Sequence, residues 1–151
     1  MINCSEDVLA FHNEEVTLPQ KERTDMRDRR DANRDRLVTR LEAEEQPNPD
    51  SFIKQGSYAM LTMVQDSDND YDIDDGVYFT QEELTRENGT EFSPREIKAI
   101  VCEALKDDRF KKQPQVRTSC VRIFYDEGYH VDMPIYRIRT LGGQYEIADD
   151  A

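Results

Sequence analysis

The sequence predicts an α+β domain, in which helices pack on one side of a mixed or mostly antiparallel sheet. A charged helical stretch that follows Thr17 and runs to about residue 45 is ended by prolines, and a capped amphipathic helix begins at Ser93. Two β-rich runs then follow, at residues 116–125 and 129–138. A chain of 151 residues is long enough for one domain with its own core and too short for two full domains, so we expect one domain over residues 1–151.

The composition is that of an acidic, highly charged chain. Its net charge is −13, 35% of its residues are charged and its mean hydropathy is −0.88, which argues against a general nucleic-acid-binding surface. A nucleotide substrate is compatible with this charge, because Mg²⁺ neutralises carboxylates and phosphates together. Three separated cysteines and two isolated histidines argue against a disulfide framework or a zinc site. No apolar stretch approaches the ~20 residues of a membrane span, and no basic region precedes an apolar core at the N-terminus, so we expect a soluble, cytoplasmic protein without a membrane partner.

The N-terminal part is predicted to hold one long helix. Residues 1–16 are expected to be irregular, with a few apolar side chains that could pack as a short helix. Thr17 is a candidate N-cap, Pro19 suits the first helical turn, and two prolines end the helix after about residue 45. Alternating Arg and Asp residues offer i,i+4 ion pairs. We therefore expect a solvated helix with one packed stripe, the alternative being that one of its arginines contacts phosphate.

The later elements follow from local patterns. A short helix or strand is expected at residues 58–64, and residues 70–79 alternate and then become apolar, as a strand entering a core does. Ser93 begins a capping box that opens a helix with one apolar face. A turn at residues 126–128 joins the two β-rich runs into a hairpin. The acidic tail at residues 141–151 is expected to be mobile.

Six aspartates are clustered at positions 66, 68, 70, 72, 74 and 75. A solvated acidic loop is usual for like charges, but this run ends in an apolar strand. An EF-hand loop needs Gly at its position 6 and Glu at its position 12. A loop starting at residue 66 has Tyr71 and Val77 there, and one starting at residue 70 has Asp75 and Gln81, so neither register fits. The third interpretation is a site for two metal ions.

A two-metal site needs alternate carboxylates, a third acid and a turn that holds phosphate, and each is present. Asp72 and Asp74 point to one side of the predicted strand, about 7 Å apart at ~3.3–3.4 Å per residue. Asp132 is the lone carboxylate on its face of the second hairpin strand. Gly56 and Ser57 form a turn that is able to hold phosphate through backbone N–H groups. Two Mg²⁺ ions about 3.5–4 Å apart would suit in-line phosphoryl chemistry at such a place.

Three segments carry a resemblance to a known family: Gln55-Gly-Ser57, Asp72-Ile-Asp-Asp-Gly-Val-Tyr78 and His130-Val-Asp-Met-Pro-Ile-Tyr136. In this order they resemble the catalytic signatures of the cGAS/DncV-like nucleotidyltransferases, within the DNA polymerase β-type superfamily. The resemblance is closest to the bacterial cyclic-oligonucleotide synthases that act in anti-phage defence, and it spans roughly residues 21–136. It implies a polymerase β-like nucleotidyltransferase core with a long N-terminal helix and a second packing helix.

The resemblance also implies roles for single residues. Gln55, Gly56 and Ser57 would contact the triphosphate of an NTP, ATP or GTP above all. Three acids, Asp72, Asp74 and Asp132, would bind two Mg²⁺ ions, with Mn²⁺ as an alternative. The last of them would help to deprotonate the acceptor hydroxyl. A ribose 2′- or 3′-hydroxyl would attack an α-phosphate and pyrophosphate would leave, which would make cyclic di- or trinucleotide second messengers.

The register of the acids has one alternative. The general superfamily pattern has an apolar residue after the second acid, which favours Asp70 and Asp72, whereas the closer bacterial group favours Asp72 and Asp74. We assign the latter pair and keep Asp70 as the alternative ligand. His130, beside the third acid, is expected to support that acid rather than to act as a base.

Length separates this chain from the family that it resembles. Members are generally about twice as long and continue into a helical half that completes the nucleotide pocket. The resemblance therefore implies a catalytic core that lacks this half, and that needs either the half itself or a regulatory protein partner. Two other functions stay open: transfer to an RNA, protein or small-molecule acceptor by an enzyme of the same superfamily, and a non-catalytic assembly module. The residues do not indicate the base, the linkage or the ring size of a product.

Overall fold

The computed structural model describes residues 5–12, 17–60, 63, 72–126, 128–139 and 145–148. Its order of helices and strands confirms the predicted α+β class. The helices are α1 (Ser5–Phe11), α2 (Gln20–Ala43), α3 (Gly56–Met60) and α4 (Pro94–Leu105). The strands are β1 (Ser51–Gln55), β2 (Asp72–Thr80), β3 (Gln115–Val116), β4 (Cys120–Phe124), β5 (His130–Ile138) and β6 (Tyr145–Ile147).

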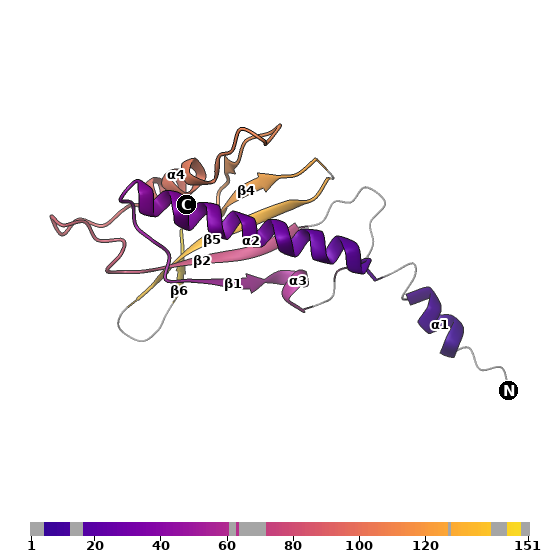
Figure 1. Ribbon diagram of the computed structural model, residues 1–151. Coiled ribbons are helices and arrows are strands. Elements are labelled where there is room, and N and C mark those ends of the chain that lie inside the picture. The colour runs from indigo at the N-terminus through magenta and orange to yellow at the C-terminus, as the bar shows by residue number, and fades with distance from the viewer. Residues whose placement is uncertain are drawn as a thin grey trace.

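The strands form one mixed sheet in the order β1-β2-β5-β4-β3, with β6 also paired to β5. The central strands β2 and β5 are parallel, and the other neighbours are antiparallel. Figure 1 shows the long helix α2 lying across one face of this sheet. Helices α2 and α4 contribute to one core with the central strands, so the predicted layer of helices over a mixed sheet is confirmed.

The core between α2, α4 and the sheet consists of almost fully buried aliphatic side chains, among them Leu37, Leu41, Ile73, Val77, Ile97, Val101, Val131, Met133 and Ile135. Three of these lie at alternate positions of β5, as predicted. Because successive strand residues point to opposite faces, the residues that alternate with them, His130, Asp132 and Pro134, point away from the helices. The same alternation separates Asp72 and Asp74 from the core side of β2.

Helix α2 differs from its prediction at its start and in its charges. It begins at Gln20 with Pro19 as N-cap and without a capping side chain, and Thr17 instead donates a hydrogen bond to the carbonyl oxygen of His12 (2.9 Å). Arg34 and Arg36 pair with Asp75 and Asp107, which lie outside the helix. These two arginines therefore join the helix to the sheet and to a loop, which the expected i,i+4 pairing did not predict.

Both terminal segments contain regular structure. Within residues 1–16, which were expected to be irregular with a possible short helix, Ser5–Phe11 is that helix, but its apolar residues Val8, Leu9 and Phe11 do not pack and are about 60% exposed. Within the tail at residues 141–151, which was expected to be mobile, Tyr145–Ile147 is strand β6. Strand β4 pairs only with the first half of β5. The edge of the second half, which β4 leaves unpaired, pairs with β6, and this pairing satisfies its backbone hydrogen bonds.

Two local predictions hold closely. Helix α4 has the full capping box, in which the Ser93 hydroxyl accepts from the Glu96 backbone and the Glu96 carboxylate accepts from Ser93. Strands β4 and β5 form the expected hairpin, and Gly128 in its turn has a φ of 102°. Such a backbone conformation favours glycine. The pairing that this turn imposes positions one side of the candidate site.

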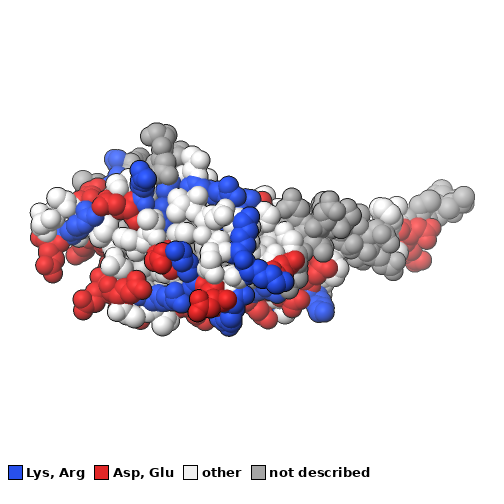
Figure 2. All heavy atoms as spheres, turned by 90° about the horizontal axis from the view of Figure 1, so that it is seen from above, with Lys and Arg blue, Asp and Glu red and all other residues white. Residues whose placement is uncertain are grey.

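The surface agrees with the acidic composition. On the face shown in Figure 2, Asp and Glu side chains are interspersed with Lys and Arg. None of the described helices combines the length and the apolar character needed to cross a bilayer.

Candidate active site

The three predicted acids come together where the central strands begin. Asp72 and Asp74 lie on β2, Asp132 lies on β5, and the parallel register sets Asp74 directly beside Asp132. Residue 72 is the partner of His130 in the same register, and the His130 Nε2 atom lies 3.5 Å from Asp72 Oδ1. All three carboxylates are on the sheet face that points away from α2 and α4. Asp70, the alternative ligand, lies outside the described residues.

Asp75 serves a different purpose from its neighbours. Alternation turns it toward α2, where it is fully buried and accepts two hydrogen bonds from the Arg34 guanidinium, one of them 2.7 Å long. The same guanidinium lies 5.0 Å from the ring centre of Phe52. A buried carboxylate that is held by both oxygens in this way joins the helix to the sheet. It is therefore a structural residue in the middle of the acidic motif.

Arg122 is the residue of the site that the sequence interpretation missed. Its Nε and Nη2 atoms donate to the two oxygens of Asp132, at 2.7 and 2.6 Å, and Nη2 lies 3.8 Å from Asp72 Oδ2. These bonds raise the pKa of the Arg122 guanidinium. The signal was present, because a hairpin turn centred on residue 127 pairs position 122 with position 132, as the structure does.

The carboxylates repel one another in spite of Arg122. Burial raises the pKa of Asp74, and the charges of Asp132 and Asp72 raise it further, while Arg122 opposes them. Cys120, on the strand next to Asp132, has a pKa raised to about 12 by burial and by that acid, so it remains a thiol. The site thus holds more negative charge than its single arginine offsets.

The glycine of the predicted phosphate turn fits closely against this group. Gly56 follows β1 with a φ of +65°, and a Cβ atom placed on it would lie 2.3 Å from Asp74 Oδ2. An alanine there would have to displace the carboxylate. Ser57, the next residue, is exposed. The structure therefore places the Gly-Ser turn beside the second acid, as a site built from both would need.

Gln55, the third residue predicted to contact phosphate, makes hydrogen bonds to two tyrosines, one on β2 and one on β5. Its Nε2 donates to the Tyr78 hydroxyl (2.7 Å), and its Oε1 accepts from the Tyr136 hydroxyl (3.0 Å). The two tyrosine rings are stacked, with 4.7 Å between their centres. A Cβ atom on Gly76 would lie only 2.8 Å from the Tyr78 ring and 2.9 Å from Gln55 Nε2. The side chain of Gln55 thus joins two stacked tyrosines on the sheet face that carries the acids.

The chemistry of the donors suits a hard divalent cation, since carboxylate oxygens are the ligands that Mg²⁺ takes. Within the described ranges, however, no three acidic, histidine or cysteine side chains are arranged as a metal site. Both oxygens of Asp132 accept hydrogen bonds from Arg122. A cation shared by the three acids would relieve the repulsion that raises the pKa of Asp74. The residues fit such an ion in charge and type.

The comparison with family models gives one match. The model described as cyclic GMP-AMP synthase DncV-like, nucleotidyltransferase domain, matches residues 50–136. This range contains the Gly-Ser turn, all three acids and Arg122.

Solved structures share the fold. CdnG of Bradyrhizobium diazoefficiens, a CD-NTase in complex with GTP, has a TM-score of 0.66 at 22% identity, over 88% of this chain and 37% of that one. CdnC of E. coli MS115-1, in a complex with HORMA-deltaN, has a TM-score of 0.66 at 20% identity, over 94% of this chain and 45% of that one. DncV of Vibrio cholerae, with 3′-deoxy ATP bound, has a TM-score of 0.64 at 15% identity, over 88% of this chain and 50% of that one. The chain spans half or less of the length of these three proteins.

Proposed function

Because this chain belongs to the family of DncV-like nucleotidyltransferase domains, we propose that it transfers nucleotidyl groups from ATP or GTP and forms cyclic di- or trinucleotides. The observation that carries this proposal is the register of β2 and β5, which sets Asp74 beside Asp132, with Gly56 against Asp74. Acids on adjacent strands next to a backbone turn suit the binding of a metal-bound triphosphate.

Asp72, Asp74 and Asp132 are the residues that would hold divalent metal, Mg²⁺ or Mn²⁺. Bound there, such ions would lower the pKa of an acceptor hydroxyl and neutralise charge on the phosphates. The excess negative charge around Asp74 supports this assignment, because a cation would stabilise all three carboxylates.

The protein's own residues would position the triphosphate and the acceptor hydroxyl. The absence of a side chain at Gly56 leaves room beside Asp74, where the triphosphate would approach the backbone of the turn. Asp132 is the acid that would take the proton from the ribose hydroxyl as its oxygen bonds to the α-phosphorus and the bond to pyrophosphate breaks. Arg122 is a positioning residue, since its two hydrogen bonds hold the Asp132 carboxylate in one orientation.

A signalling role in anti-phage defence and a location in the cytoplasm belong to the proposal as well. So does a protein partner: the CdnC neighbour is recorded in a complex with HORMA-deltaN, and a comparable partner for this chain would supply surfaces that complete the nucleotide pocket.

Product analysis tests the proposed reaction. The chain is incubated with ATP, GTP or both in Mg²⁺, released pyrophosphate is measured, and products are treated with phosphatase and identified by mass spectrometry. We expect a phosphatase-resistant cyclic product, and its loss in Asp72→Asn plus Asp74→Asn but not in the exposed control Asp108→Asn. A linear product on another acceptor would refute cyclisation. Absence of pyrophosphate, together with no rise in Tm on addition of ATP and Mg²⁺, would refute the function.

A further inference from the structure

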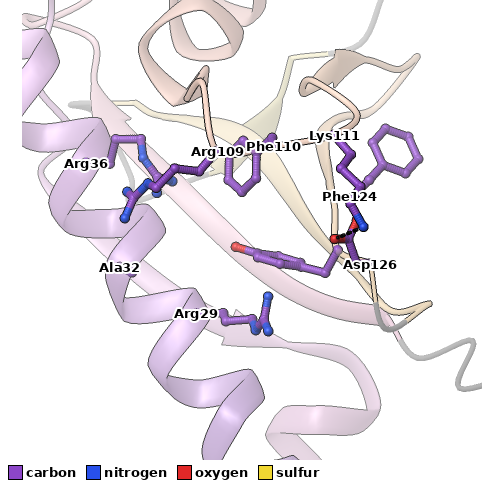
Figure 3. A pocket seen from close by; sticks show the side chains of 9 residues that line it. Arg29, Ala32, Arg36, Arg109, Phe110, Lys111, Phe124 and Asp126 are labelled. Carbon is purple, nitrogen blue, oxygen red and sulfur yellow. Dashed lines mark ion pairs between the residues drawn. The ribbon is translucent and has the colours of Figure 1, made fainter.

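A hollow lies beside helix α2, between that helix and the hairpin strand β4. It has a volume of about 350 Å³, and its walls come from α2, from the loop after α4 and from the end of β4. Helix α2 covers the sheet face opposite the carboxylates. Phe124, at the rim of the hollow, pairs with His130 on the face of the acids, and the two rings are stacked with 5.9 Å between their centres. Figure 3 shows side chains from α2 on one side of this hollow and from the two other segments facing them.

Positive charge gathers in this hollow although the chain carries a net charge of −13. Its lining includes Arg29, Arg36, Arg109 and Lys111. Two carboxylates oppose them. Asp107 accepts from Arg109 (2.7 and 2.8 Å) and from Arg36 (3.1 Å), and Asp126 pairs with Lys111 (2.7 Å). The hydrogen bonds from Arg109 lower the pKa of Asp107, which therefore stays ionised. Four cations against two acids leave the hollow positive.

Aromatic rings hold two of these cations in place. The Arg29 guanidinium lies 4.6 Å from the ring centre of Tyr125, and that of Arg36 lies 5.0 Å from the ring centre of Phe110. The Phe110 ring meets the Tyr125 ring edge-on at 5.8 Å. Asn33 accepts hydrogen bonds through Oδ1 from the Tyr125 hydroxyl (3.0 Å) and from Arg36 Nη1 (2.9 Å). The wall is thus formed before any ligand arrives, which lowers the entropy lost on binding.

We propose that this hollow binds a small phosphorylated ligand with a planar ring, the chemistry of a nucleoside monophosphate. Charged N–H donors from several side chains suit a phosphate group. The phosphate would lie between Arg109, Lys111 and Arg36, and the planar ring would lie against the aromatic side chain of Phe110, which also lines the hollow. The volume is within the range of small-molecule sites, about 300–1,000 Å³.

Binding of AMP in EDTA, followed by ¹H–¹⁵N spectra of the labelled chain, tests this site without catalysis. Chelation of divalent metal prevents metal-dependent binding at the acids, so failure of nucleotidyl transfer does not bear on the result. We expect the amides of residues 109–111 and 124–126 to shift with a common Kd, and those of residues 55–57 to stay in place. AMP should bind at least tenfold more tightly than ribose 5-phosphate, because the latter lacks the planar ring.

The matched variant removes two cations that do not support the fold. Arg109 and Lys111 have side chains that are 80% and 78% exposed, so Arg109→Gln plus Lys111→Gln should fold normally and bind AMP at least tenfold more weakly. The control Lys21→Gln plus Arg95→Gln removes the same charge from exposed positions elsewhere and should change the Kd by less than twofold. Three results would each overturn the proposal: no shifts in the named amides at millimolar AMP, equal loss in both variants, or inorganic phosphate binding as tightly as AMP.

Discussion

Arg122 holds both oxygens of Asp132 across the β4–β5 hairpin, at 2.7 and 2.6 Å, and its Nη2 atom also lies 3.8 Å from Asp72 Oδ2. A guanidinium and a divalent cation both offset the negative charge of these carboxylates. In the metal-free protein Arg122 provides this stabilisation, and a bound cation of higher charge would provide part of it. Stability measured with and without metal can separate the two contributions.

The first prediction concerns Arg122→Gln. Without metal, the variant should lose about 2 kcal/mol of unfolding free energy, because the buried carboxylate of Asp132 loses two charge-assisted hydrogen bonds. Mg²⁺ should recover part of this loss, since it stabilises the native state by binding to it. Thermal unfolding in EDTA and in Mg²⁺ measures both quantities, with the exposed Arg95→Gln as control. A rise in Tm with Mg²⁺ that is no larger in the variant than in the wild type would contradict the shared site.

The sequence predicts those features of the fold that depend on neighbouring residues. The capping box at Ser93, the alternation of β5 and the turn at Gly128 all follow from spacings of a few residues, and the structure has each of them. The pairing of Arg122 with Asp132 was also within reach, because a turn fixes the register of its two strands.

Contacts between distant segments were out of reach. Arg34 and Asp75 are 41 positions apart, and they meet only because α2 crosses β2 at that point. In the local pattern, Asp75 differs from Asp72 and Asp74 only in pointing to the other face of the strand. The role of Gln55 depends in the same way on Tyr78 and Tyr136, which reach it from two other strands.

The second prediction uses two glycines with similar backbones. Gly56→Ala and Gly89→Ala both place a side chain at positive φ, +65° and +79°, and should each lose about 1 kcal/mol or more of stability. At Gly89 the new Cβ meets open space, whereas at Gly56 it would lie 2.3 Å from Asp74 Oδ2. Only Gly56→Ala should therefore also lower nucleotidyl transfer, by about 100-fold, the effect of misplacing a reacting group by ~1 Å. Equal activity of the two variants would show that the contact with Asp74 does not matter.

The third prediction concerns pH and Asp74. Burial and the neighbouring acids raise the pKa of this carboxyl in the folded chain above its ordinary value of 3.8. Such a group opposes folding once it is ionised, so its contribution to stability falls as pH rises through the folded pKa. In EDTA at pH 7, Asp74→Asn should therefore be more stable than the wild type, by about 1 kcal/mol. The gain should vanish as pH falls below 3.8, where Asp74 is protonated in both states.

Urea unfolding at a series of pH values measures this gain, and Asp108→Asn, at an exposed position, serves as the control. A constant difference across the series would assign the effect to packing, not to charge.

The fourth prediction separates the structural acid from the acids of the site. Asp75 is fully buried and Arg34 depends on it, whereas the Asp72 side chain is 50% exposed. Asp75→Asn should lose about 3–4 kcal/mol of unfolding free energy, because the charge-assisted hydrogen bonds between Arg34 and a fully buried carboxylate are lost. Asp72→Asn should change stability by less than about 1 kcal/mol.

A double-mutant cycle with Arg34→Met and Asp75→Leu, measured by urea unfolding, tests whether the ion pair causes this loss of stability. If it does, the double variant should lose less stability than the two single variants lose together, because a pair of apolar residues of similar size replaces a buried ion pair at little cost. Additive losses would instead show that Arg34 and Asp75 act independently.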